Sequence, residues 1–454
     1  MPFDFSKIDT GATAWVLASA ALVLLMTPGL AFFYGGMVRA KNVLGMLMQN
    51  YVAIGIVSVL WVLVAYSLAF SKSGFGGFAG NLHQLGLGHM NQQVAGYTGP
   101  LAQTIPPLVF VAFQLMFAVI TPALITGATA DRLKFGAYVV FIAIWVIVVY
   151  APIAHWVFSP EGWLFQKGAE DFAGGTVVHA NAGAAGLALA LVIGRRVGWK
   201  KDPMRPHNLP FTLLGAGLLW FGWFGFNAGS ALGANNLAGY AFVNTNTATA
   251  AAMLGWILVE KLRDGHPTTL GAASGAVAGL VAITPAAGFV SPMGALFLGL
   301  IAGAVCALAV SLKYRFGFDD ALDVVGVHLV GGVAGALLIG FFGTKATGVG
   351  INGLFYGGGW HLMKLQAIAV GAAVGYSFVA TLVIGKVLDL VMGLRITRDQ
   401  ELEGMDTVLH AETAYEFGTV QGGTFGGLSS GGHGAVSIGG ASAPSATTGA
   451  GAQA

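Results

Sequence analysis

The sequence predicts an all-α integral membrane protein that crosses the bilayer many times. Only 9% of its 454 residues are charged, whereas soluble domains average about 25%, and the mean hydropathy is +0.76. Apolar runs long enough to cross a bilayer recur along the chain. Positive residues cluster in short loops that alternate between two predicted faces. These observations exclude an ordinary soluble domain, and the net charge of +2 gives no indication of a nucleic-acid partner.

Eleven apolar runs approach the length of about 20 residues that a membrane-spanning helix needs. They lie at 13–34, 43–70, 105–130, 135–157, 173–194, 210–232, 240–261, 268–287, 291–312, 321–342 and 363–392. No small-residue cleavage site follows the first run, so we expect a retained span rather than a signal peptide. Cys306, the single cysteine, lies in the ninth run and is predicted to be a small core residue.

The distribution of Lys and Arg predicts the orientation of these spans. With the loop after the first span placed inside, 16 of the 21 positive residues fall inside and five outside. The outside residues are Lys7, Lys72, Lys167, Lys345 and Lys364. We therefore expect the N-terminus outside and the C-terminus inside.

Two weak internal similarities predict an inverted repeat. Val-His at 178–179 matches Val-His at 327–328, and each histidine has glycine at the fourth and seventh following positions. Ile-Thr-Pro-Ala occurs at 120–123 and again at 283–286. These pairs place spans three and eight, and five and ten, in equivalent positions, and an offset of five spans inverts the second copy. We expect a five-plus-five inverted repeat with an extra C-terminal span; chance matching of short strings is the alternative.

Composition divides the chain into a membrane part and a tail. Residues 1–416 are predicted to form the membrane domain, in which the charged stretch 393–416 is a cytoplasmic C-terminal region. Residues 417–454 are rich in Gly, Ser and Ala and poor in large apolar side chains, which is typical of disorder.

His179 and His328 are the candidate pathway residues. Each lies eight residues after an aspartate at one end of its span, Asp171 or Asp320, which is about 12 Å along a helix. Because the two spans enter a core about 30 Å thick from opposite faces, both histidines reach the midplane. A neutral imidazole offers one donor and one acceptor there. A lone buried histidine is often a core residue, but two at equivalent depth favour a shared pathway, and no acidic or thiolate companion supports a metal site.

Carboxylates and aromatic rings flank this pathway. Asp171 is expected to cap the first turn of span five and to favour a cation at the outer mouth. Asp323, five residues before His328, is interpreted as its inner counterpart, structural or in a proton relay. The aromatic runs 113–117 and 220–226 offer ring faces that attract cations, although most such rings are packing residues.

Four strings resemble the ammonium transporter (Amt/Mep/Rh) family, and the resemblance covers about residues 12–417. They are FFYGG at 32–36, DFAGGTVVH at 171–179, WFGFNAGS at 223–230 and DDALDVVGVH at 319–328. The stretch from Gly404 to Tyr415 is similar to the family's cytoplasmic C-terminal region. The chain is thereby identified as a bacterial Amt-type protein of the cytoplasmic membrane.

The resemblance implies roles for individual residues and partners. Phe117 and Phe226 match the stacked rings of an outer gate, and Ser230 matches a hydroxyl of the outer ammonium site. His179 and His328 match paired pore histidines that share a hydrogen bond. The family also implies near-pore roles for Gln114 and Trp223, a homotrimer with a pore in each subunit, PII-type regulatory proteins at the cytoplasmic face, and methylammonium as a substrate analogue.

One position departs from the family pattern. Phe158 stands where the outer cation site often has tryptophan, and phenylalanine has a weaker quadrupole and no N–H donor. Trp156 or Trp163 is the candidate to compensate. We expect Phe117, Phe158 and Ser230 to form the outer site, whose strength depends on whether one of these tryptophans compensates.

The sequence therefore favours transport over three other functions. NH4+ is expected to be bound outside, deprotonated, and passed as NH3 between the histidines, with separate proton transfer as an open possibility. A sensor that acts through residues 393–415 is the first alternative. A channel of the aquaporin type lacks its Asn-Pro-Ala turns here. An enzyme lacks a nucleophile-base set, a phosphate loop or a metal motif, and no cofactor is expected.

Overall fold

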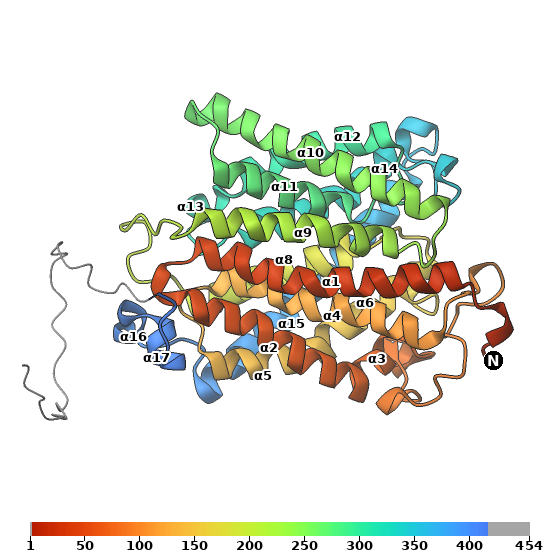
Figure 1. The fold of residues 1–454 in the computed structure, drawn as a ribbon, viewed down its shortest axis with the longest axis horizontal. Coiled ribbons are helices and arrows are strands. Elements are labelled where there is room, and N and C mark those ends of the chain that lie inside the picture. Colours follow the sequence, from red (N-terminus) through yellow and green to blue (C-terminus); the bar gives the residue numbers. More distant parts are fainter. Residues whose placement is uncertain (1, 416–454) are drawn as a thin grey trace, which may run out of the picture. The chain divides into compact units, whose positions relative to one another are not determined.

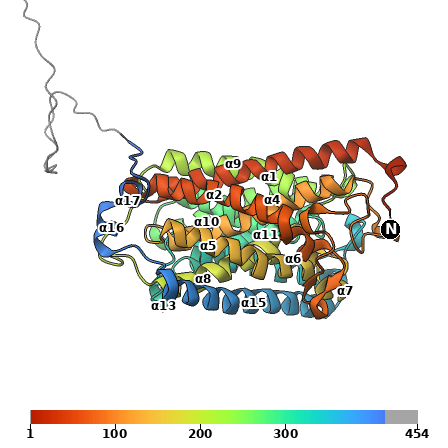
Figure 2. The same cartoon turned by 90° about the horizontal axis from the view of Figure 1, so that it is seen from below.

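A computed structural model describes residues 2–415, and it is built almost entirely of helices. The α-helices are α1 Thr10–Met37, α2 Val43–Leu60, α3 Tyr66–Phe70, α4 Pro107–Thr129, α5 Phe135–Trp145, α6 Ala151–Phe158, α7 Trp163–Gln166, α8 Asn181–Ile193, α9 Leu209–Gly229, α10 Asn236–Asp264, α11 Thr269–Ile283, α12 Pro292–Ala309, α13 Leu312–Phe316, α14 Val330–Phe342, α15 His361–Met392, α16 Arg398–Glu403 and α17 Met405–His410. Strands β1 Ser73–Gly74 and β2 Ala79–Gly80 form a short antiparallel pair. The long helices run side by side with roughly aligned axes (Figures 1 and 2).

Four π-helical segments interrupt or precede these helices. They are η3 Trp61–Ala65, η7 Val146–Tyr150, η8 Gly175–Ala180 and η9 Val325–Leu329. Segments η8 and η9 contain His179 and His328. Single turns of π-helix occur frequently at functional sites, and here two of them hold the predicted pathway residues.

The all-α membrane architecture is confirmed. Within the described residues, ten helical segments are long and apolar enough to cross a membrane. The predicted span at 268–287 corresponds to α11, which has 15 residues, about 22 Å of helix. Most of α11 is buried by other helices, and short or irregular spans are tolerated where protein rather than lipid surrounds them. The count of eleven spans stays a prediction.

The loops lie at the two ends of the long helices (Figures 1 and 2). At one end, Arg39 and Arg196 both pair with Asp131. At the other end, the N–H of Phe172 donates to the carbonyl of Pro285 at 3.0 Å. Following the predicted orientation, we call the end with Asp131 the inner end and the end with Phe172 the outer end. The orientation itself stays a prediction.

The two histidine segments have matching lengths. Helices α8 and α14 have 13 residues each, and α14 begins 149 positions after α8, the same offset that separates His328 from His179. Arg132 donates to the carbonyls of Gly194, after α8, and Asp319, before η9. The end of α8 therefore lies beside the start of η9, as antiparallel packing of equivalent segments requires. This arrangement agrees with the predicted inverted repeat.

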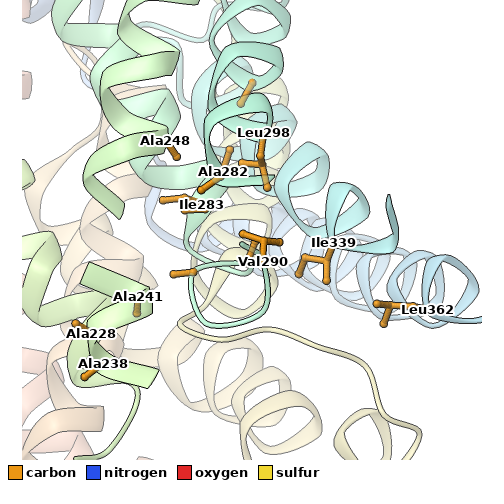
Figure 3. Close-up of a cluster of buried hydrophobic side chains, with 14 residues drawn as sticks. Ala228, Ala238, Ala241, Ala248, Ala282, Ile283, Val290, Leu298, Ile339 and Leu362 are labelled. Carbon is orange, nitrogen blue, oxygen red and sulfur yellow. The ribbon is translucent and has the colours of Figure 1, made fainter. Parts of the chain in front are cut away.

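A cluster of small buried side chains supports the outer half of the molecule. It consists mainly of alanines from α9, α10 and α11, together with Leu298 of α12, Ile339 of α14 and Val290 from the loop after α11 (Figure 3). Small residues allow helix backbones to approach closely in membranes. Phe172, Phe289 and Ile351 pack against this cluster, so the cluster holds the segment that carries Asp171.

The C-terminal segment packs on the inner end. Asp406 of α17 accepts hydrogen bonds from the N–H groups of Leu44 and Gly45 at the start of α2, at 3.0 and 2.8 Å. Glu401 of α16 pairs with Arg395 at 2.6 Å and accepts from the N–H of Val197 at 2.7 Å. The predicted disordered tail, 417–454, lies outside the described residues.

Candidate functional site

A cavity of about 460 Å³ opens at the outer end. Five residues selected from the sequence line it, namely Gln114, Phe117, Phe158, Asp171 and Ser230. The hydroxyl of Ser230, which follows α9, donates to the carbonyl of Phe226 at 2.8 Å and keeps its lone pairs for a further donor. The structure thus gathers the predicted outer-site residues from separate parts of the chain.

Two phenylalanine rings lie at the inner limit of this cavity. The centroids of Phe117 in α4 and Phe226 in α9 are 4.2 Å apart, with a 36° angle between the ring planes. Both side chains are almost fully buried. Phe226 also lies 6.1 Å from the ring of His179. Phe117 lines the cavity and Phe226 approaches His179, so the two stacked rings extend from the cavity wall toward the histidines.

Phe158 lines the cavity, but the neighbouring tryptophans do not. Its ring lies edge-on to Phe117, with centroids 6.5 Å apart. The indole N–H of Trp156 donates instead to the carbonyl of Phe78 at 2.7 Å. Neither Trp156 nor Trp163 is among the residues that line the cavity. The sequence did not indicate Tyr97, which lines the cavity and donates to the carbonyl of Phe158 at 3.0 Å.

Asp171 caps the π-helical segment η8. Its carboxylate accepts hydrogen bonds from four consecutive N–H groups, those of residues 174–177, at 2.7–3.0 Å. Gly174 turns the chain here with φ of 113°, a conformation that side-chain-bearing residues rarely adopt. Burial raises the pKa of Asp171, although the four hydrogen bonds oppose that shift. The carboxylate therefore caps the start of η8 and also lines the outer cavity.

The two histidines meet inside the helix bundle. The Nδ1 atoms of His179 and His328 are 3.3 Å apart, and the ring planes differ by 17°. Trp223 stacks on His179 with centroids 5.3 Å apart and donates to the hydroxyl of Thr284 at 2.8 Å. His179 Nε2 is buried and has no hydrogen-bond partner among residues 2–415.

The contacts of Tyr34 determine which nitrogen donates and which accepts when His179 and His328 are both neutral. Its hydroxyl lies 3.1 Å from the carbonyl of Leu124 and 3.4 Å from His328 Nε2. Because a carbonyl only accepts, Tyr34 donates to Leu124 and accepts from His328 Nε2–H. His328 Nδ1 is then the acceptor of the His179 Nδ1–H bond. His179 Nε2 is consequently left as an acceptor, suited to an N–H donor.

The inner counterpart of Asp171 is Asp320, which corrects the choice of Asp323 from the sequence. Asp320 accepts from the N–H groups of Val324 and Val325 at 3.1 and 2.7 Å, the start of η9. Asp323 instead has φ of 63° and pairs with Lys313 at 2.7 Å. Burial raises the pKa of Asp320 to about 6, although Lys313 lowers it. The equal spacing of Asp171 and Asp320 from the histidines was the signal for this assignment.

An inner cavity of about 500 Å³ lies at the opposite end and is lined by charged side chains. Arg196 lines this cavity and binds both carboxylate oxygens of Asp319, at 2.8 and 2.9 Å. Burial alone would raise the pKa of Asp319, but the hydrogen bonds and charge of Arg196 lower it. Among residues 2–415, no three His, Cys, Asp or Glu side chains group closely enough to hold a metal ion.

Comparison with known proteins identifies the family. A model described as the Ammonium Transporter Family matches residues 14–415. This chain belongs to the ammonium transporter family. An ammonium transporter of Mycobacterium tuberculosis is 54% identical over 439 residues, with 91% of this chain and 92% of that protein covered. The crystal structure of Saccharomyces cerevisiae Mep2 superposes with a TM-score of 0.80 at 35% identity, covering 87% of this chain and 92% of Mep2.

A third similar protein is a solved structure entitled Sensor Amt Protein. It superposes with a TM-score of 0.80 at 31% identity, covering 88% of this chain and 98% of that structure. These similarities confirm the resemblance seen in the sequence. The protein is a multi-pass protein of the cell membrane that transports ammonium and is not an enzyme.

Proposed function

We propose that this transporter binds NH4+ in the outer cavity, removes one proton, and passes NH3 between Phe117 and Phe226 to the histidine pair. The cation would be held by the ring faces of Phe117 and Phe158 and by the hydroxyl of Ser230. The observation that carries the proposal is the unpartnered His179 Nε2, directly beyond the phenylalanine rings. Gln114 and Trp223 would shape the route on either side of the rings.

Deprotonation before passage is favoured by the cost of desolvation. Moving an unpaired ammonium ion into a buried apolar site costs several kcal/mol even after the protein relaxes. Neutral NH3 avoids most of that cost and still offers N–H donors. His179 Nε2 would accept one of them, which partly replaces the hydrogen bonds that NH3 loses on leaving water.

The histidine pair also provides a route for the proton. The Nδ1–Nδ1 distance of 3.3 Å is within reach of a hydrogen bond, through which a proton would move between the rings, and Tyr34 extends the chain of hydrogen-bonding groups toward the inner half. If the proton follows this route, transport is electrogenic. If it returns to the outer solution, only NH3 crosses.

Proteoliposomes that contain the purified protein test these alternatives. We expect ammonium to evoke a transient current, with methylammonium giving a smaller one and potassium none. Internal alkalinisation without current would indicate passage of NH3 alone. Absence of both signals, in vesicles shown to contain folded protein, would contradict transport through this route.

Alanine at both positions 179 and 328 tests the relay separately. We expect the double variant to lose the ammonium-evoked current at least tenfold, because no hydrogen-bonding groups then join the two halves. His207, a histidine before α9 and away from the pair, provides a matched control as His207→Ala. An undiminished current in the double variant would exclude the proton relay.

We also propose a homotrimer with one pathway per subunit and a PII-type protein as the cytoplasmic partner, as family resemblance implies. Packing of α16 and α17 on the inner end supports a regulatory contact there. A sensor role is the second candidate, supported by the similarity to the Sensor Amt Protein. Native mass measurement tests the trimer, and pull-down of purified PII protein with and without residues 393–415 tests the partner.

A further inference from the structure

Glu170 is a buried carboxyl group in the wall of the outer cavity that the proposed pathway does not use. It precedes the capping residue Asp171 and lines the same cavity as Phe158 and Ser230. Its residue surface is 7% exposed. Nothing in the sequence patterns distinguished it, because a Glu-Asp pair before a span is also expected of a solvated loop.

The backbone of Glu170 is held by a buried side chain of α15. The amide of Gln366 accepts from the Glu170 N–H at 2.7 Å and donates to the Glu170 carbonyl at 2.7 Å. It also donates to the carbonyl of Ala336 in α14 at 3.0 Å. Glu170 therefore occupies a defined place at the junction of two helices and the cavity wall.

Half of the Glu170 carboxyl group has no partner. The Ile351 N–H donates to this carboxyl group, whereas Oε2 is buried and has no partner among residues 2–415. Oε1 lies 3.0 Å from where a side chain at Gly350 would begin. Burial raises the pKa of Glu170 to about 8, although the Ile351 N–H lowers it. An unpaired buried carboxylate is costly, and either a proton or a cation relieves that cost.

We propose that Glu170 is a second cation-binding residue of the outer cavity: its carboxylate binds monovalent ammonium, and its neutral form releases it. This inference rests on the proposed function, because it adds a binding group to the same outer site. Ammonium in the cavity that Glu170 lines compensates the charge of this carboxylate and supplies N–H donors to the group. Protonation of Glu170 removes both interactions.

The other charged groups near Glu170 do not neutralise its carboxylate. Asp171, its sequence neighbour, directs both oxygens to the start of η8. Lys167 on its own segment, Lys345 on the loop after α14 and Lys364 on α15 are exposed. None of them forms an ion pair with Glu170 within the described residues. Within residues 2–415, the carboxylate therefore has no side-chain cation to balance its charge.

Glu170→Gln in the full-length protein tests the proposal, since it keeps the shape and an acceptor for the Ile351 N–H but removes the charge. Uptake is measured in proteoliposomes from pH 6 to 9, with KM expressed as NH4+ concentration. In the unmodified protein, KM should fall about fivefold between pH 6.5 and pH 8.5, which corresponds to roughly 1 kcal/mol. In Glu170→Gln, KM should stay at its low-pH value and kcat should change little.

Two further variants separate the possible outcomes. Glu161→Gln, at the outer end but lining a different cavity, should behave like the unmodified protein. Glu170→Asp keeps the charge and should retain the pH dependence of KM. It tests the proposal independently of whether Glu170→Gln folds well. An unchanged KM profile in Glu170→Gln, or an equal loss of kcat at every pH, would overturn the inference. Absence of ammonium uptake by the unmodified protein would instead contradict the proposed function.

Discussion

At the scale of single residues, the outer site combines ring faces with few polar atoms. Phe158 and Phe117 lie edge to face, and the cavity that they line also includes Ser230, Asp171 and Glu170, so a cation bound there would meet ring faces as well as carboxyl groups. The family resemblance identified the two phenylalanines and Ser230 from the sequence. It did not reveal Tyr97 or Glu170, because their roles depend on contacts with distant segments.

Phe158→Trp should strengthen the outer site. Indole has the stronger quadrupole, and an improved cation–π contact is worth about 0.5–1 kcal/mol at a partly exposed site. We expect KM for ammonium to fall about twofold to fivefold, measured by uptake at constant pH. Phe165→Trp, on another part of the cavity wall, is the control and should leave KM unchanged. An equal effect of both variants would contradict a specific role for Phe158.

At the scale of elements, the two short π-helical segments η8 and η9 position the histidines. Each π-helical turn starts at a carboxylate that caps its N–H groups, Asp171 or Asp320, and each continues into a 13-residue helix. The repeat was visible in the sequence through its histidines and glycines. The π-helical geometry was not, because apolar periodicity does not distinguish it from an α-helix over one turn.

Asp171→Asn should destabilise the protein more than Asp320→Asn. Each oxygen of Asp171 accepts two N–H groups, so an amide leaves two of them unpaired, whereas Asp320 loses one acceptor. Each unpaired buried group costs about 1–3 kcal/mol. Thermal unfolding in detergent should give the lower midpoint for Asp171→Asn. The reverse order would show that the caps do not determine stability here.

Gly183→Ala and Gly332→Ala should separate the histidines. A methyl group on Gly183 would lie 2.3 Å from the backbone N of Leu329, and one on Gly332 would lie 2.8 Å from the N of Ala180. Backbone atoms cannot yield without moving the segments, so we expect uptake to fall at least tenfold. Gly371→Ala in α15, where the methyl group meets open space, is the control. Normal uptake by the two test variants would contradict close packing at the pair.

At the scale of the whole molecule, the C-terminal segment connects the inner ends of distant helices. Asp406 contacts the start of α2, and Glu401 contacts the loop after α8 through Val197. A change in this segment therefore reaches both the second and the fifth predicted spans. Such a connection would give the proposed regulatory partner a physical route to the proposed pathway.

Asp406→Ala should release α17 without unfolding the membrane domain. It removes the acceptor for two N–H groups at the start of α2, so we expect faster proteolysis within residues 393–415 and uptake reduced several-fold. Limited proteolysis and uptake are measured on the same preparation. Asp399→Ala, an exposed acidic residue of α16, should leave both unchanged. Equal protection of the two variants would show that Asp406 does not hold the segment.

The sequence by itself determined the all-α membrane class, the family, and the residues expected along the pathway, because hydropathy, charge bias and short motifs are local properties. Tertiary structure decided which groups meet. It identified Asp320 rather than Asp323 as the inner cap and showed that neither Trp156 nor Trp163 lines the outer cavity. It also showed that the contact between Tyr34 and His328 leaves His179 Nε2 as a hydrogen-bond acceptor. It revealed the buried, unpartnered oxygen of Glu170. These outcomes depend on contacts between segments far apart in the chain, which no local pattern encodes.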